Sequence, residues 1–137
     1  MISTGTTTAL RLSYYNQRKD ECGMINRKQQ QKTERVEHLR GGEGSVLRRT
    51  LIAPEDSCGK FRMCAKMTLE PGCTIGEHTH MPDAEFCYLL EGELVIADGG
   101  TEHTVHPGDA WMCGGGAGHY TKNCSEHNAV FLAIVTE

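Results

Sequence analysis

The chain has 137 residues and a net charge of −4, enough length for one domain with a hydrophobic core. It has no apolar run long enough to span a bilayer and no apolar amino-terminal stretch typical of a secretory signal, so we expect a cytoplasmic protein without membrane contact. Residues 1–40 hold eight Lys or Arg against four Asp or Glu, whereas residues 41–137 hold six against fourteen. Such an acidic domain binds nucleic acid poorly, and we expect no nucleic-acid partner.

The first 40 residues are polar and predict a basic amino-terminal arm that is partly flexible or helical. Its charge favours docking onto an acidic domain, its own or a partner's. Residues 1–23 are interpreted as an extension ahead of an alternative start at Met24. Gly41-Gly42-Glu43-Gly44 then marks the entry to the folded domain, residues 41–137.

Short strands separated by turns are predicted throughout residues 41–137. The pattern is clearest from Phe61 to Leu69, where alternate residues are apolar, as in a half-buried strand. Further strands are expected at residues 45–52, 75–80, 85–90, 94–97, 101–105, 110–113, around residue 119 and at 129–135. Many short strands with almost no helical periodicity indicate an all-β sandwich or barrel.

Three histidines and one glutamate in this region form a candidate metal site. His78 and His80 are two residues apart, so on a strand they face the same way. Glu85 can return after the short turn 81–84, and His119 would join by long-range strand pairing. Three imidazoles and one carboxylate suit a borderline first-row transition metal, which needs no thiolate ligand.

These four residues lie in a frame of fixed spacings that resembles both conserved motifs of the cupin family. The first motif is matched without a gap, and in the second Gly114 stands where a proline is usual. The framing residues are Gly72, Gly92, Gly108, Gly116 and Asn123. The resemblance covers roughly residues 41–137.

The resemblance implies a double-stranded β-helix, a jelly-roll barrel that holds one divalent transition metal (Mn, Fe, Ni, Zn, Co or Cu) through His78, His80, Glu85 and His119. It implies a metal-dependent enzyme acting on a small oxygenated metabolite, of the dioxygenase, decarboxylase or isomerase type. The alternative is a non-catalytic module that binds or senses a small molecule or metal. Small cupins commonly form homodimers, so we expect a homodimer here too.

Four further positions are weaker candidates, and no general acid or base is identified. Cys87 shares the Glu85 face and is interpreted as a core cysteine, with a cavity position as the alternative. Asp83 is interpreted as a turn residue rather than as an acid supporting a ligand. Arg62 and Lys66 share one strand face and could hold a carboxylate, or they could face solvent. The seven cysteines contain no CxxC pair and favour reduced thiols over a disulfide framework.

Overall fold

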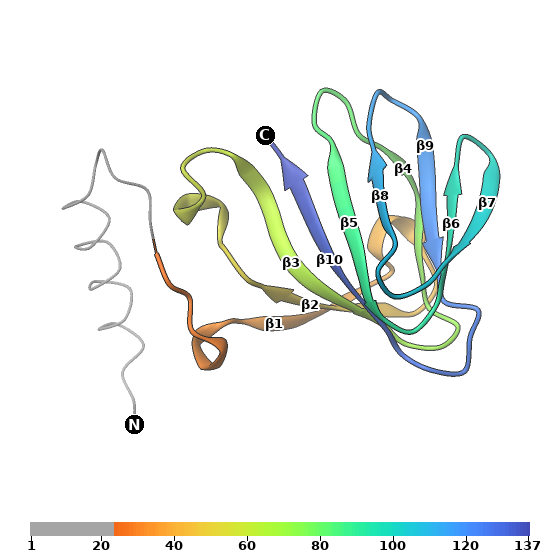
Figure 1. Cartoon of the computed structure of the whole chain (residues 1–137), viewed down its shortest axis with the longest axis horizontal. Coiled ribbons are helices and arrows are strands. Elements are labelled where there is room, and N and C mark those ends of the chain that lie inside the picture. Colours follow the sequence, from red (N-terminus) through yellow and green to blue (C-terminus); the bar gives the residue numbers. More distant parts are fainter. Residues whose placement is uncertain (1–23) are drawn as a thin grey trace.

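The structure is a computed structural model that describes residues 24–137. These residues form two antiparallel β-sheets that face each other and curve into a barrel (Figure 1). The all-β prediction is therefore confirmed. The expected extension, residues 1–23, lies outside the described residues, as does most of the predicted arm. No helix among the described residues is long and apolar enough to cross a membrane.

Ten strands and three short 3₁₀ helices make up the described chain. In spatial order, the six-stranded sheet holds β1 (Thr33–Glu37), β2 (Ser45–Thr50), β3 (Phe61–Leu69), β10 (Ala129–Thr136), β5 (Glu85–Glu91) and β8 (Ala110–Cys113). The four-stranded sheet holds β4 (Thr74–Thr79), β9 (Gly118–Lys122), β6 (Leu94–Asp98) and β7 (Thr101–Val105). The 3₁₀ helices are η1 (Lys28–Gln30), η2 (Leu39–Gly41) and η3 (Pro54–Asp56).

The core lies between the inner faces of the two sheets. On β3 the alternation predicted from the sequence is present: Ala65, Met67 and Leu69 point inward and are buried. Phe131 on β10 and Leu94 on β6 join them from neighbouring strands and the opposite sheet. Apolar area from both sheets is thus removed from water, which is the main stabilising contribution to such a fold.

Strand β1 lies before Gly41, where the sequence places the start of the folded domain. It pairs in antiparallel register with β2, with Val36 opposite Val46 and Glu34 opposite Arg48. The segment has one apolar residue, Val36, so its sequence carries no periodicity that would predict a strand. The backbone hydrogen bonds of β2 hold it in place, and a partner strand of this kind cannot be read from local sequence.

Candidate metal centre

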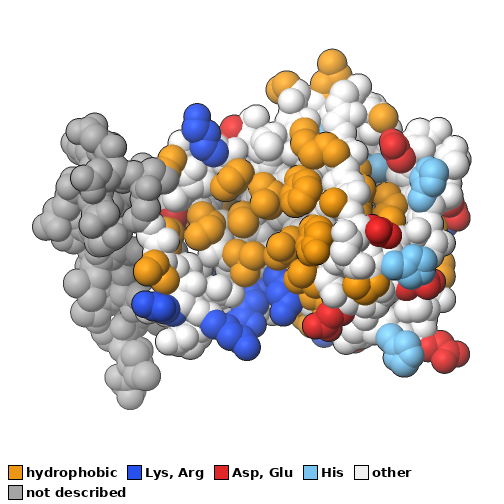
Figure 2. Space-filling view, viewed as in Figure 1, with side chains coloured by type: hydrophobic (Ala, Val, Ile, Leu, Met, Phe, Trp, Pro, Cys, Tyr) orange, Lys and Arg blue, Asp and Glu red, His pale blue; other side chains and the backbone are white. Residues whose placement is uncertain are grey.

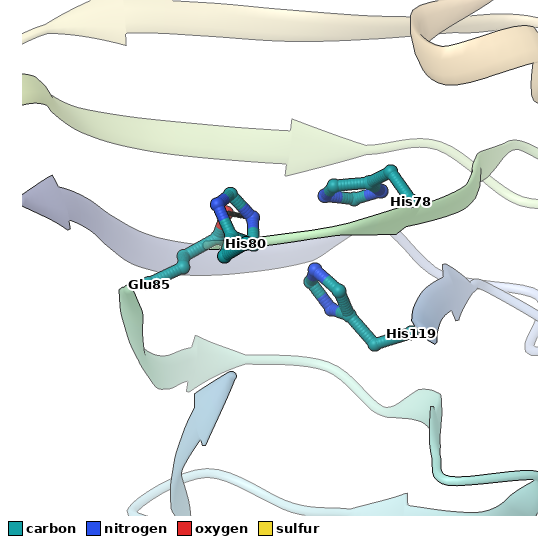
Figure 3. Close-up of side chains that lie close together, drawn as sticks. All are labelled: His78, His80, Glu85 and His119. Carbon is teal, nitrogen blue, oxygen red and sulfur yellow. Dashed lines mark ion pairs between the residues drawn. The ribbon is translucent and has the colours of Figure 1, made fainter. Parts of the chain in front are cut away.

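The pairing of β4 with β9 brings the first histidines together. His78 on β4 lies directly opposite His119 on β9, and a register shift between Ile75 and His78 sets this alignment. His80 follows at the end of β4, and Glu85 is the first residue of β5 in the other sheet. Figure 3 shows the three rings and the carboxylate converging from β4, β9 and β5. The four residues chosen from the sequence are therefore adjacent in space.

The geometry of the cluster is compact. One ligand atom from each of the four residues lies within 4.8 Å of all the others. The His78 and His119 ring centroids are 4.1 Å apart, and that of His80 lies 5.0 Å from His78 and 5.1 Å from His119. His80 and His119 are buried, with 3% and 2% of their surface exposed.

Two of the imidazoles are oriented by hydrogen bonds at Nδ1. His78 Nδ1 lies 2.8 Å from the Gly76 carbonyl oxygen, and His80 Nδ1 lies 3.1 Å from Asp83 Oδ2. Because both partners are acceptors, Nδ1 carries the proton and the lone pair remains on Nε2. Metal-binding histidines are commonly fixed in this way, with the other nitrogen bonded to a carboxylate or a carbonyl.

Three buried imidazole nitrogens have no hydrogen-bond partner among the described residues: His80 Nε2, His119 Nδ1 and His119 Nε2. His80 Nε2 is 3.2 Å from Glu85 Oε2, but this contact lacks the geometry of a hydrogen bond. Buried polar atoms left unpaired are costly and require an explanation. A metal ion bound at the centre of the cluster would satisfy His80 and one nitrogen of His119, and the N₃O donor set fits a borderline divalent metal.

His78 and His119 are held neutral by their surroundings. Burial, reinforced by the other two imidazoles, lowers the pKa of His119 from 6.5 to about 4. Burial also lowers the pKa of His78. At neutral pH both rings are therefore uncharged, which is the state in which imidazole binds a metal.

Asp83 supports the cluster from outside it. Its carboxylate accepts from His80 and from Arg62 Nη1, at 2.8 Å, and it is only 8% exposed. The hydrogen bond from His80, helped by the Arg62 charge, lowers the pKa of Asp83. The interpretation as a simple turn residue is therefore too limited, and the supporting role is the one observed. The three-residue spacing from His80 was the available signal.

Cys87 lies beside the cluster and inside the core at once. Its thiol donates to Glu85 Oε1 at 3.0 Å, and only 1% of the residue is exposed. Burial, followed by the charge of Glu85, strongly raises the pKa of the Cys87 thiol, which keeps it protonated. The core interpretation is right, and the thiol also fixes the carboxylate.

The other cysteines only partly match the expectation of reduced thiols. Cys64, Cys73, Cys87, Cys113 and Cys124 are free. Cys58, however, is disulfide-bonded, so the expectation fails at that position. The cytoplasmic location expected from the sequence stays a prediction.

The cluster opens into a cavity of about 410 Å³. Apolar side chains from β3, β4 and β10 form part of its wall, among them Met67, Ile75 and Phe131. Three arginines (Arg40, Arg48 and Arg62) and three acidic residues (Glu34, Asp83 and Glu85) provide the charges. A cavity of this size, in which apolar walls face convergent polar and charged groups, is typical of a small-molecule site.

Arg62 and Lys66 are separated by the structure. A register shift between Val135 and Thr136 leaves Arg62 as an extra residue in β3, and its side chain turns to Asp83 at the cavity. Lys66 lies opposite Arg49, on the outer side of the sheet. The prediction that both share one face is wrong, because a β-bulge changes the direction of one side chain.

A family model described as "Cupin domain" matches residues 65–135, about half of the chain. The chain belongs to the cupin family. This cupin is 33% identical over 117 residues to an "Oxalate-binding protein" of Thermotoga maritima, covering 85% of this chain and 97% of the relative. A crystal structure of a predicted oxalate decarboxylase from T. maritima superposes with a TM-score of 0.78 at 33% identity, over 82% of this cupin and 98% of that chain.

More distant structures share parts of the fold. A sugar phosphate isomerase of the cupin superfamily from Silicibacter pomeroyi matches with a TM-score of 0.60 at 30% identity, over 67% of this cupin and 59% of that chain. The polyketide cyclase RemF from Streptomyces resistomycificus matches with a TM-score of 0.69 at 22% identity, over 82% of this cupin and 80% of that chain. The second likeness concerns the fold alone.

Proposed function

We propose that His78, His80, Glu85 and His119 bind one divalent transition metal (Mn, Fe, Ni, Zn, Co or Cu), and that the cavity beside it takes a small carboxylate metabolite. The observation that carries the proposal is the set of unpaired imidazole nitrogens buried where the four ligand atoms converge. A metal of coordination number five or six would have one or two positions left for a bound molecule beside the four protein ligands. The metal, once bound, supplies Lewis-acid polarisation of a carbonyl or carboxylate oxygen.

The charge of the cavity supports an anionic ligand. The three arginines that line it are balanced by three carboxylates. A divalent metal adds two positive charges, which a dicarboxylate would neutralise. The relative from T. maritima is described as oxalate-binding, so oxalate is the first ligand to test on this cupin.

A metal-dependent enzyme of the dioxygenase, decarboxylase or isomerase type is one form of this function, and a non-catalytic binding protein is the second. One observation favours the second form. Among the described residues, each carboxylate of the cavity is already engaged: Asp83 by His80 and Arg62, and Glu34 by Arg48. Glu85 belongs to the metal cluster. General acid or base catalysis would need a carboxylate that is free to exchange its proton.

Metal analysis tests the first step. Protein purified after growth with defined metals should contain about one metal per chain. His78→Ala should lose it, because one of four ligands is removed. His103→Ala, an exposed change on β7, is the matched control and should keep its metal. Equal metal content in wild type and His78→Ala would refute the site.

Calorimetric titration with oxalate tests the second step. Metal-loaded wild type should bind oxalate, and metal-free protein should bind much more weakly. Incubation with oxalate, followed by measurement of formate and carbon dioxide, separates an enzyme from a binding protein. If the metal-free control still binds oxalate and converts it to formate and carbon dioxide, the reaction does not depend on the metal.

We also propose that the chain forms a homodimer through the outer face of the six-stranded sheet. Apolar side chains gather over β3, β10 and β5 (Figure 2). Phe86, Tyr88, Leu90 and Met112 are between 36% and 58% exposed on this face. A contiguous apolar patch on a folded domain commonly marks a protein interface, and a second copy offers the same surface in return. Light scattering should give twice the chain mass at micromolar concentration, and a monomer mass would refute the proposal.

A further inference from the structure

A short loop between β1 and β2, residues 38–44, forms part of the wall of the cavity through Leu39 and Arg40. Arg40 in this loop lines the cavity together with His78 and His119. Its backbone is left-handed, with φ 55° and ψ 29°, and His38 is also left-handed, with φ 49°. Non-glycine residues rarely adopt this conformation, and those that do are held there by surrounding contacts and occur preferentially at functional sites.

Hydrogen bonds fix the loop on both sides. His38 donates its backbone N–H to the Gly44 carbonyl at 2.8 Å, and its Nδ1 lies 3.0 Å from the Gly42 carbonyl oxygen. Glu43 and Thr74 exchange two bonds: the Thr74 N–H reaches the Glu43 carbonyl at 2.9 Å, and Thr74 Oγ1 accepts from the Glu43 N–H at 2.8 Å. The loop is therefore attached to the start of β4.

The contact between this loop and β4 is unusually close. A Cβ added to Gly76 would collide with the Arg40 carbonyl oxygen, and one added to Gly42 would collide with the Thr74 carbonyl oxygen. Only glycine fits at these two positions. Arg40 is thereby seated beside Gly76, two residues before His78, whose ring Gly76 also orients.

Arg40 differs from the other two arginines of the cavity in having no acidic partner among the described residues. Arg48 pairs with Glu34 at 2.9 Å, and Arg62 pairs with Asp83 at 2.8 Å. The Arg40 guanidinium has no hydrogen bond or ion pair within residues 24–137, and the residue is exposed.

The structure assigns Arg40 as the residue that binds the free carboxylate of a ligand whose other end is held by the metal; this rests on the proposed function. The guanidinium has five donors in a planar fork that matches a carboxylate. A fixed backbone lowers the entropic cost of placing that fork. Arg40 therefore selects anionic ligands over neutral ones of similar size and acts as a specificity-determining residue.

The test compares four metal-loaded proteins by calorimetric titration with oxalate: wild type, Arg40→Gln, Arg40→Lys and the matched control Arg27→Gln. Arg27 is exposed, lies outside the cavity and has no side-chain hydrogen bond or ion pair to a described residue. Losing a charged hydrogen-bonding partner should weaken oxalate binding roughly 10–100-fold in Arg40→Gln. Metal content should be unchanged, Arg27→Gln should bind as wild type does, and Arg40→Lys should recover part of the affinity.

The outcomes separate the two proposals. Oxalate affinity within twofold of wild type in Arg40→Gln, with the metal retained, overturns the role of Arg40 and leaves the metal site standing. If metal-loaded wild type does not bind oxalate, oxalate is not a ligand of this cupin, and the proposed role of Arg40 is overturned with it. If His78→Ala lacks metal but still binds oxalate in an Arg40-dependent way, the anion site is supported and the metal-dependent function fails.

Discussion

The two faces of strand β5 differ in polarity: the inner face carries a carboxylate and a thiol, and the outer face carries exposed apolar side chains. On the inner face, Glu85 meets His80, and Cys87 donates to Glu85 before the strand continues into the core at Leu89. On the outer face, Phe86, Tyr88 and Leu90 present apolar side chains to the surface. A half-buried strand ordinarily has its apolar residues inside and its polar residues outside. At the cavity end of β5 this order is reversed.

The two reversals have different physical reasons. The inner carboxylate is tolerated because imidazoles and a thiol surround it and a metal would neutralise it, since a buried charge needs a partner. The outer apolar residues remain in contact with water in the single chain, so they gain stability only when another surface covers them. A polar group inside therefore indicates chemistry, and an apolar group outside indicates association.

The largest expected difference between the faces concerns stability. Leu89 is fully buried, whereas Leu90, its neighbour on the same strand, is 38% exposed. Leu89→Ala should lower the free energy of unfolding by about 2–5 kcal/mol, because it removes buried contacts and leaves a cavity. Leu90→Ala should cost less than about 1 kcal/mol in the dissociated chain. Urea unfolding at low protein concentration measures both, and equal losses would mean that the faces are not distinct.

The next effect concerns the support of the inner site. Asp83→Asn removes the carboxylate that orients His80 and should weaken metal affinity roughly 10–100-fold, as is typical for partners of metal-bound histidines. Glu126→Gln, an exposed change away from the cluster, is the control. Competition with a chelator gives the affinities. An Asp83→Asn protein with unaltered affinity would show that the ring is oriented without this contact.

A smaller effect is expected from pH on the metal-free protein. Because the pKa of His119 falls from 6.5 to about 4 on folding, the unfolded chain binds more protons than the folded chain between these values. The free energy of unfolding should therefore decrease as pH falls from 6.5 to about 4, by on the order of 1–3 kcal/mol.

Urea unfolding across this range, after removal of metal with a chelator, gives the slope. His119→Gln should have a shallower dependence on pH whatever its absolute stability, because the titrating group is gone. A slope that is the same in both proteins would assign the effect to other groups.

A substitution on the outer face should have the smallest effect on the free energy of unfolding but should change the molecular mass in solution. Tyr88→Lys places a charge in the apolar patch, where 36% of the tyrosine is exposed. The free energy of unfolding of the single chain should change by less than about 0.5 kcal/mol, as for other surface changes. Light scattering should show the mass falling from dimer to monomer. The exposed change Thr101→Lys on β7 is the control and should leave the mass unaltered.

The sequence by itself determined the all-β class, most of the strands and the identity of the four clustered residues. The reason is local: alternation predicts strands such as Phe61–Leu69, and the spacing of His78 and His80 puts both on one face. The glycine frame around them also carried the family resemblance. These features are encoded by residues close together in the chain.

Only the tertiary structure decided which groups support and surround the cluster. Strand β1, the turn of Arg62 toward Asp83 and the seat of Arg40 beside Gly76 all depend on contacts between distant segments. A β-bulge or a left-handed residue changes where a side chain points without leaving a periodic signal in the sequence. The ligands could be named from their spacing, whereas the charges that face them required the fold, because pairing of remote strands sets their distances.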